Sequence, residues 1–199
     1  MRITDDRYQG EIEKFNLAIR MIRHEARTGT IRNFTGFTED RIRKLYGAYF
    51  KSGSNLTVRR RRGKSPRQIN RFVSSTRRHT EATLLACLLR HYRAIRFDQQ
   101  RKPVPINKLE KITLGNRLCH AFESYATLYA DPEFNFEWTW NLYHALVESQ
   151  ELLFSQCSTC GGSYVQDAFA LDYHWCPLCE QKQLLRNNCQ LNDHNRELG

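Results

Sequence analysis

The sequence predicts a mainly α-helical protein with a helix-turn-helix-like element near the N-terminus and a small C-terminal zinc ribbon. Three observations predict this fold class. Apolar residues recur at helical spacing through most of residues 11–153, turn-forming residues separate the periodic segments, and four cysteines form two close pairs between positions 157 and 179. We expect a helical domain over residues 1–153 and a zinc-binding ribbon with its tail over residues 154–199.

The N-terminal region is expected to hold two helices and a short turn, a helix-turn-helix outline over about residues 11–50. Residues 11–26 are apolar on one helical face, and Thr28-Gly29 is expected to end that helix. Thr38 is the expected N-cap of the second helix, because its hydroxyl can accept from an N–H of the first turn. Glu39 and Asp40 would then complement the helix dipole.

Longer helices are expected over about residues 81–97, 109–130 and 133–154. Asp131-Pro132 is expected to start the last of these, because aspartate can cap a helix and proline suits its first position. This helix is apolar on more than one side, so we expect it in the middle of the core or at a subunit interface. Short strands are expected at residues 163–165 and 169–175.

Positive charge is concentrated in one part of the chain. The net charge is +10, and residues 41–80 contain 13 Lys or Arg and no Asp or Glu. Residues 112–199 instead contain four bases and 11 acids. A run of guanidinium groups without acids is typical of a polyanion site, since solvated faces usually mix both signs. The pattern therefore favours nucleic-acid binding over simple solvation.

The basic segment divides into a helix and an arm. Arg41, Arg43 and Lys44 lie near the start of the expected second helix, where they are candidates for reading base pairs of duplex DNA. Residues 51–80 are interpreted as an exposed arm that grips the DNA backbone or a narrow minor groove. The candidate DNA-binding residues of this arm are Arg59, Arg60, Arg61, Arg62, Lys64, Arg67 and Arg71.

The paired cysteines follow the pattern C-x2-C-x15-C-x2-C, which predicts a zinc site. Its ligands would be Cys157, Cys160, Cys176 and Cys179. Four sulfur ligands fill the tetrahedral shell of Zn²⁺ and leave no position for a substrate, so we expect one structural ion. The alternatives are four unrelated buried thiols, or a site in which His174, Cys189 or His194 replaces a ligand.

Several classes of protein are excluded by missing features. The sequence has no apolar run of the about 20 residues that a membrane span needs, and Asp5-Asp6 follows closely on the start instead of a secretory apolar segment. An odd number of cysteines without an export signal indicates a reducing compartment, so we expect the cytoplasm. Cys87 and Cys119 are expected to be core thiols. Phosphate-loop, dinucleotide-binding, zinc-protease and hydrolase motifs are absent, so we expect no enzyme and no small-molecule substrate.

Two of these features resemble the flagellar transcriptional activator family FlhC: the segment Arg41-Ile42-Arg43-Lys44-Leu45-Tyr46 and the four-cysteine cluster, which matches the family's zinc positions one for one. The resemblance implies a DNA-binding subunit that works in a heteromeric complex with an FlhD-like protein and RNA polymerase. The chain departs from flagellar members in Ser52-Gly53-Ser54 and Arg59–Arg62, and in a neutral to acidic tail where a basic one is expected. It therefore looks more like the FlhC-like activators of conjugative plasmids and integrative elements, which switch on transfer genes in the bacterial cytoplasm.

Two rival functions use the same residues. An RNA-binding zinc-ribbon protein of a translation or RNA-processing complex would have the same charge and cysteines. A nucleic-acid enzyme could have catalytic acids dispersed along the sequence. The helix-turn-helix outline favours duplex DNA, and the duplex-binding activator is the hypothesis that we retain.

Overall fold

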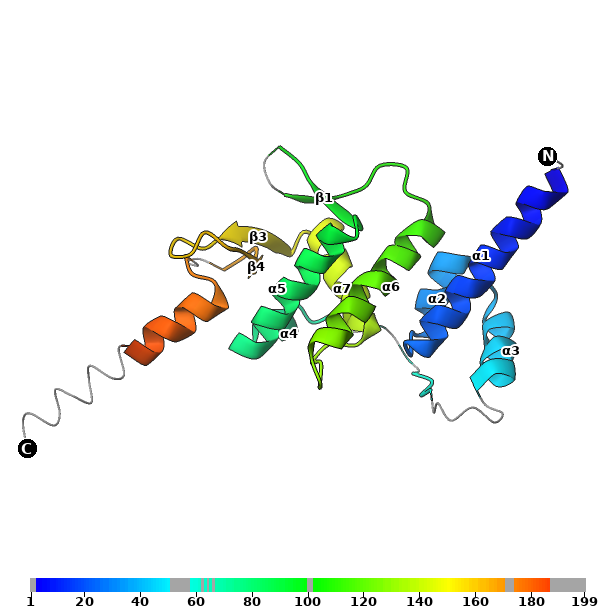
Figure 1. Cartoon of the computed structure of the whole chain (residues 1–199), viewed down its shortest axis with the longest axis horizontal. Coiled ribbons are helices and arrows are strands. Elements are labelled where there is room, and N and C mark those ends of the chain that lie inside the picture. Colours follow the sequence, from blue (N-terminus) through cyan, green and yellow to red (C-terminus); the bar gives the residue numbers. More distant parts are fainter. Residues whose placement is uncertain are drawn as a thin grey trace, which may run out of the picture.

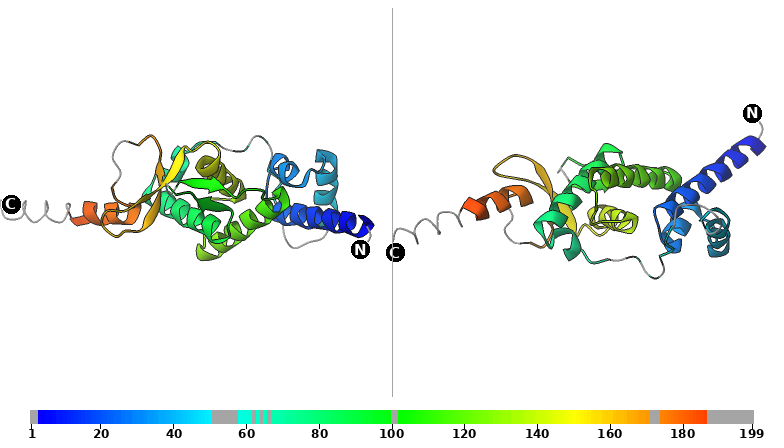
Figure 2. Two further views of the ribbon diagram at one scale, coloured as in Figure 1. Left: turned by 90° about the horizontal axis from the view of Figure 1, so that it is seen from above. Right: turned by 60° about the horizontal axis from the view of Figure 1, so that its bottom comes forward.

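A computed structural model describes residues 3–50, 58–61, 63, 65, 67–99, 102–170 and 174–186. The protein is mainly helical and elongated (Figure 1). Three N-terminal helices lie at one end, a central group of helices follows, and the cysteine-bearing hairpin lies at the other end. The views in Figure 2 show that the N-terminal part of the first helix and residues 177–186 project from opposite ends of the molecule.

The helices and strands have the following bounds. The helices are α1 (Ile3–Arg23), α2 (Thr28–Thr35), α3 (Glu39–Phe50), α4 (Asn70–Val73), α5 (Thr76–His91), α6 (Lys111–Leu128) and α7 (Phe136–Val147). Residues 177–186 are also helical. The strands form two antiparallel pairs, β1 (Ile95–Phe97) with β2 (Pro103–Pro105) and β3 (Leu152–Gln156) with β4 (Ser163–Asp167).

The connection between α1 and α2 differs from the prediction. Glu25 adopts a left-handed conformation with φ 57°, and Ala26 N donates to Met21 O at 2.9 Å, which closes the C-terminus of α1. The expectation that Thr28-Gly29 ends this helix is therefore wrong, because these residues open α2. The expected cap of α3 is confirmed, since Thr38 Oγ1 accepts from Arg41 N at 3.3 Å.

The ends of the central helices also differ from the prediction. The hydroxyl of Ser75 caps α5, so the helix starts before residue 81, and it stops at His91 instead of residue 97. A left-handed Arg93, with φ 56°, closes α5, and residues 95–97 form β1. The expectation that Asp131-Pro132 starts the last helix is wrong, because the side chain of Asn135 caps α7 by accepting from the first-turn amides.

The core of the molecule surrounds α7. This helix lies beside α5 and α6 (Figures 1 and 2), and most of its side chains are buried, which confirms the expected central position. It ends at Val147, and β3 occupies residues 152–156, where the sequence predicted the helix to continue. Two fully buried aromatic residues, Tyr125 and Phe134, join α6 to the segment before α7, since the Tyr125 hydroxyl accepts from Phe134 N at 3.1 Å.

A close approach of α6 to α1 and α2 joins the N-terminal helices to the central helices. Gly115 lies on α6, and a Cβ atom there would lie 2.8 Å from Leu17 Cδ2 and 3.2 Å from the side chains of Met21 and Phe34. These three residues are buried on α1 and α2. Only glycine therefore lets α6 approach both helices this closely.

The cysteine-bearing hairpin is fastened to the helical core. His79 on α5 contacts the Val165 carbonyl oxygen through Nε2 at 2.5 Å, and Thr83 Oγ1 accepts from Val165 N at 3.2 Å. Leu152 and Val165 are part of the main hydrophobic core. The helical residues 177–186 directly follow Cys176 and contain Cys179. The described part of residues 169–175 contains no strand, contrary to the prediction. No helix among the described residues has both the length and the apolar character to cross a membrane.

Candidate metal centre and basic surface

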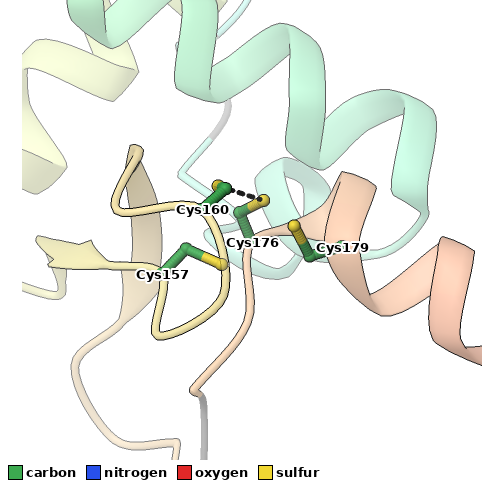
Figure 3. A group of neighbouring side chains, drawn as sticks. All are labelled: Cys157, Cys160, Cys176 and Cys179. Atoms are coloured by element: carbon green, nitrogen blue, oxygen red, sulfur yellow. Dashed lines mark hydrogen bonds between the residues drawn. The ribbon is translucent and has the colours of Figure 1, made fainter.

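Four thiols from two separate turns come together next to β3 and β4 (Figure 3). Cys157 and Cys160 belong to the turn after β3, whereas Cys176 and Cys179 lie at the start of helical residues 177–186. All four sulfur atoms lie within 4.8 Å of one another. The two predicted pairs therefore form one cluster that could bind a metal ion such as zinc.

The backbone of the first turn is shaped around its sulfur atoms. Gly161 N donates to Cys157 O at 2.8 Å and adopts a left-handed conformation with φ 69°. A Cβ atom on Gly162 would lie 3.3 Å from Cys160 Sγ, so a larger residue would crowd that sulfur. Ser158 joins the two turns, because its N–H and its hydroxyl both donate to the carbonyl of His174 at 2.8 Å.

The spacing of the sulfur atoms fits a tetrahedral ion. A zinc–sulfur bond of about 2.3 Å implies about 3.8 Å between sulfur atoms in a regular tetrahedron. Cys160 Sγ and Cys176 Sγ are 3.8 Å apart. The donor set consists only of soft sulfur ligands, which suit Zn²⁺ and not Mg²⁺ or Ca²⁺.

The thiols differ in acidity. Burial acts to raise the pKa of Cys157, but backbone N–H donors from Cys176, Cys160 and Thr159 lower it to about 6. The pKa of Cys179 is raised to about 12, first by its hydrogen bond with Cys176 and then by burial. Thiolates this close repel one another, so full ionisation of the cluster requires a cation between them.

The other candidate ligands and thiols lie elsewhere. His174 uses its carbonyl to join the two turns, and its ring is not part of the cluster. Cys189 and His194 fall outside the described residues. Cys119 is buried, as predicted, and burial raises its pKa to about 12. The prediction for Cys87 is wrong, because this thiol is exposed on α5.

The three expected base readers lie on α3 and are exposed. Arg41 lies over the ring of Phe37, 3.7 Å from its centroid, and pairs with Glu11 at 3.1 Å. Arg43 and Lys44 both contact Asp40 one turn earlier, at 3.6 and 3.1 Å. Both acids lie outside residues 41–80, the segment that contains no Asp or Glu. The fold nevertheless brings Glu11 into contact with Arg41 of that segment.

The described part of the arm is attached to the protein surface. Tyr46 on α3 donates its hydroxyl proton to Val58 O at 2.6 Å. The carboxylate of Glu25 then accepts from Arg59 N at 3.1 Å and from Arg61 Nε at 2.9 Å. The described part of the arm therefore runs along α3 and the junction between α1 and α2.

Further along, a buried carboxylate anchors the arm. Glu137 on α7 is 1% exposed and accepts from Arg27 N at 2.6 Å, from the Thr30 hydroxyl at 3.1 Å and from the Ser65 hydroxyl. The structure thus joins the start of α2, the arm and α7 at one group. The sequence contains no local signal for this contact, because Arg27 and Glu137 are 110 positions apart.

The remaining arm residues occupy different settings. Arg67 is exposed, whereas Arg71 is half-buried, lies 5.0 Å from the Trp138 ring centroid and contacts Glu133 at 3.9 Å. Arg71 is thus a packing residue as much as a surface cation. Arg60 lies over a small hollow beside Ile42 and Tyr46. Arg62 and Lys64 fall outside the described residues.

The two regions can perform different chemistry. The cysteine cluster has the donors for a metal ion, and the guanidinium groups of α3 and the arm have the donors for phosphate. No protein-family model matches the chain, and no curated protein matches it.

Proposed function

We propose that the protein is a DNA-binding subunit of a transcriptional activator, similar to FlhC, with one structural zinc ion. One observation carries this proposal. The Tyr46–Val58 and Glu25–Arg61 contacts hold the arm along α3 and the α1–α2 junction. The bases of α3 and those of the first part of the arm therefore lie at the same end of the molecule, as a contact with one duplex requires.

The sequence predicted a helix-turn-helix made of the helix over residues 11–26 and the helix after Thr38, but α2 lies between them. In this proposal, α2 and α3 act as the helix-turn-helix. The two helices are separated by residues 36–38, and Gly36 has the left-handed φ of 71° that a tight turn after a helix favours. Ile42 is buried while Arg43 and Lys44 point to the exposed side of α3. These bases are then available to the major groove, and the arm contacts the backbone.

The ion pairs on α3 are compatible with DNA binding. Arg41 and Glu11 are both nearly half exposed, and Lys44 is 79% exposed beside an exposed Asp40. Exposed pairs of this kind contribute only about 0–1 kcal/mol, so the bases can exchange carboxylate for phosphate. The release of counterions condensed on the duplex makes the binding free energy of each phosphate contact more favourable.

The zinc ion has a structural role in this proposal. Four sulfur ligands fill its coordination shell, so it has no position for a substrate. The lobe around it exposes several large apolar side chains, and apolar side chains that gather on one surface are typical of a protein-binding site. The exposed residues are Phe169, Trp175, Leu178, Leu184 and Leu185.

These exposed side chains support a heteromeric complex with another protein. The resemblance to FlhC implies two partners, an FlhD-like subunit and RNA polymerase. The departures of the arm and tail from flagellar members favour conjugative-transfer promoters over flagellar ones. A cytoplasmic location in a bacterium is part of the same proposal.

The proposal is tested by measuring binding of the full chain, with and without its partner subunit, to labelled duplex promoter fragments and to structured RNA. We expect the duplex to bind more tightly and its affinity to fall steeply with salt. A preference for structured RNA would instead support the RNA-binding alternative.

The role of α3 is tested by a double variant, Arg43→Ala with Lys44→Ala. It should lose about tenfold or more in duplex affinity, and its salt slope should fall by about two, because each lost phosphate contact removes about one released counterion. Lys182→Ala, in the exposed helix of the zinc lobe, is the control and should bind as the wild type does. An unchanged salt slope in the double variant would show that α3 is not part of the DNA interface.

A further inference from the structure

A cleft that the sequence did not indicate lies between α2, the arm and α7. Its volume is about 840 Å³, and it is lined by Arg27 and Arg32 from the α2 region, Arg67 from the arm, and Trp140, Asn141 and His144 from α7. Three arginines from two separate segments therefore line one hollow. We name it the Arg67 cleft.

The charge of the Arg67 cleft is positive. Glu137 lies beneath it, but this carboxylate is buried and already accepts from Arg27 N, Thr30 and Ser65. Arg32 contacts Glu39 at 3.2 Å, and both side chains are more than half exposed, so this pair can open at little cost. The first turn of α2 contains no acidic side chain of its own, and Glu137 contacts the start of this helix from below.

The wall formed by α7 contributes a hydrogen-bond donor. The side-chain nitrogen of Asn141, Nδ2, is buried and has no hydrogen-bond partner among the described residues. A buried donor left without a partner is unfavourable by about 1–3 kcal/mol, so an acceptor at this position is favoured. Asn141 lines the cleft, and a rotation of its side chain would turn this solvent-inaccessible donor toward a ligand there.

The cleft continues along α7. A second hollow shares Arg67, Asn141 and His144 with it and extends to Glu151. Positive groups thus lie at the α2 end and a carboxylate lies at the other end. An anionic ligand is attracted to the α2 end and is repelled near Glu151.

We propose that the Arg67 cleft binds a phosphate group of the nucleic-acid backbone, held by the guanidinium groups of Arg67 and Arg32 and by the Asn141 amide. Guanidinium groups pair with phosphate through two parallel hydrogen bonds, and an amide N–H adds a second kind of donor. This inference rests on the proposed function, and it extends the contact surface from α3 past the arm to α7. A free nucleotide carries the same phosphate chemistry and is the other source that the test must separate.

The test uses the full chain and measures duplex affinity over a salt series. Arg67→Ala should bind the duplex about tenfold more weakly, with a salt slope smaller by about one. Asn141→Asp keeps the shape of the side chain but replaces the donor by a carboxylate, and it should weaken binding by at least as much. Matched controls are exposed residues that do not line the cleft: Lys102→Ala, just before β2, removes one charge, and Asn107→Asp, between β2 and α6, makes the same amide-to-acid change.

The folded state of each variant is checked by its thermal unfolding midpoint. If the wild type binds duplex DNA while Arg67→Ala and Asn141→Asp bind it as their controls do, the cleft proposal is overturned and the proposed function stands. If the wild type binds no duplex, both are overturned. Binding of ATP to the wild type but not to Arg67→Ala, without any displacement of duplex, would assign the cleft to a free nucleotide and also overturn the proposal.

Discussion

Arg20, His24 and Glu123 form an ionic cluster between α1 and α6. The Glu123 carboxylate accepts from Arg20 Nε at 2.8 Å and from His24 Nε2 at 2.6 Å. The hydrogen bond from Arg20 is the main reason that the pKa of Glu123 falls to about 2, with burial acting in the opposite direction. Burial lowers the pKa of His24 and outweighs the effect of the carboxylate. The fold therefore holds Glu123 ionised and His24 neutral.

Both groups make the protein less stable in acid. A depressed carboxyl pKa stabilises the fold above the unfolded value and is lost as the pH falls toward 2. We expect Glu123→Gln to lower the free energy of unfolding by about 1–2 kcal/mol at pH 7, after allowance for the partly exposed site, and by much less at pH 2.5. Urea unfolding at several pH values measures this, with Glu13→Gln on the exposed face of α1 as control. An equal loss at both pH values would show that ionisation of Glu123 is not the cause.

At the scale of single elements, the sequence predicts where helices lie better than where they end. α1 and α5 both close with a left-handed residue that is not glycine, Glu25 and Arg93. In each case the next residue donates its N–H five positions back, Ala26 to Met21 and Ala94 to Leu89. This closure usually contains glycine, so neither helix end has a recognisable stop signal, and the apolar spacing continues past Arg93.

Two helical glycines should respond to alanine in opposite directions. Gly47 on α3 has no neighbour within 4 Å of an added Cβ atom, so Gly47→Ala should stabilise the protein by about 0.5–1 kcal/mol through helix propensity. At Gly115 the same change would place a methyl group 2.8 Å from Leu17 Cδ2 in the core. Overpacking should outweigh propensity there and destabilise the protein by about 1 kcal/mol or more.

Thermal and urea unfolding of both variants measure this difference. A stabilised Gly115→Ala would mean that α6 and α1 can separate without loss, and that the close approach of these helices is not required.

At the scale of the whole molecule, the cysteine cluster was predictable and the arrangement of the basic segment was not. Cysteines three positions apart on a turn converge through local geometry, so their spacing alone indicated the cluster. The contacts that place the arm depend on residues far apart in the sequence: Glu25 and Arg61 are 36 positions apart, and Glu137 and Ser65 are 72 apart. Charge counting located the bases, but the acids that hold the arm became visible only in the fold.

Loss of the metal should have a local effect. We expect the purified chain to contain about one zinc ion and Cys176→Ser to contain none, because three thiolates do not complete the shell. The helical core should persist in this variant, since Val165 remains bound to His79 and Thr83 of α5. Metal analysis, far-ultraviolet circular dichroism and hydrogen exchange over residues 157–186 measure these effects, with Cys87→Ser as control. Full metal content in Cys176→Ser would indicate a different ligand set.

The β1–β2 ribbon has a consequence for the behaviour of the protein in concentrated solution. Two of the three residues of β2, Pro103 and Pro105, carry no backbone N–H. A strand from a neighbouring molecule would find at most one donor along that edge, which is too few to continue a sheet. The β2 edge of the ribbon is thus protected against edge-to-edge association by its own sequence.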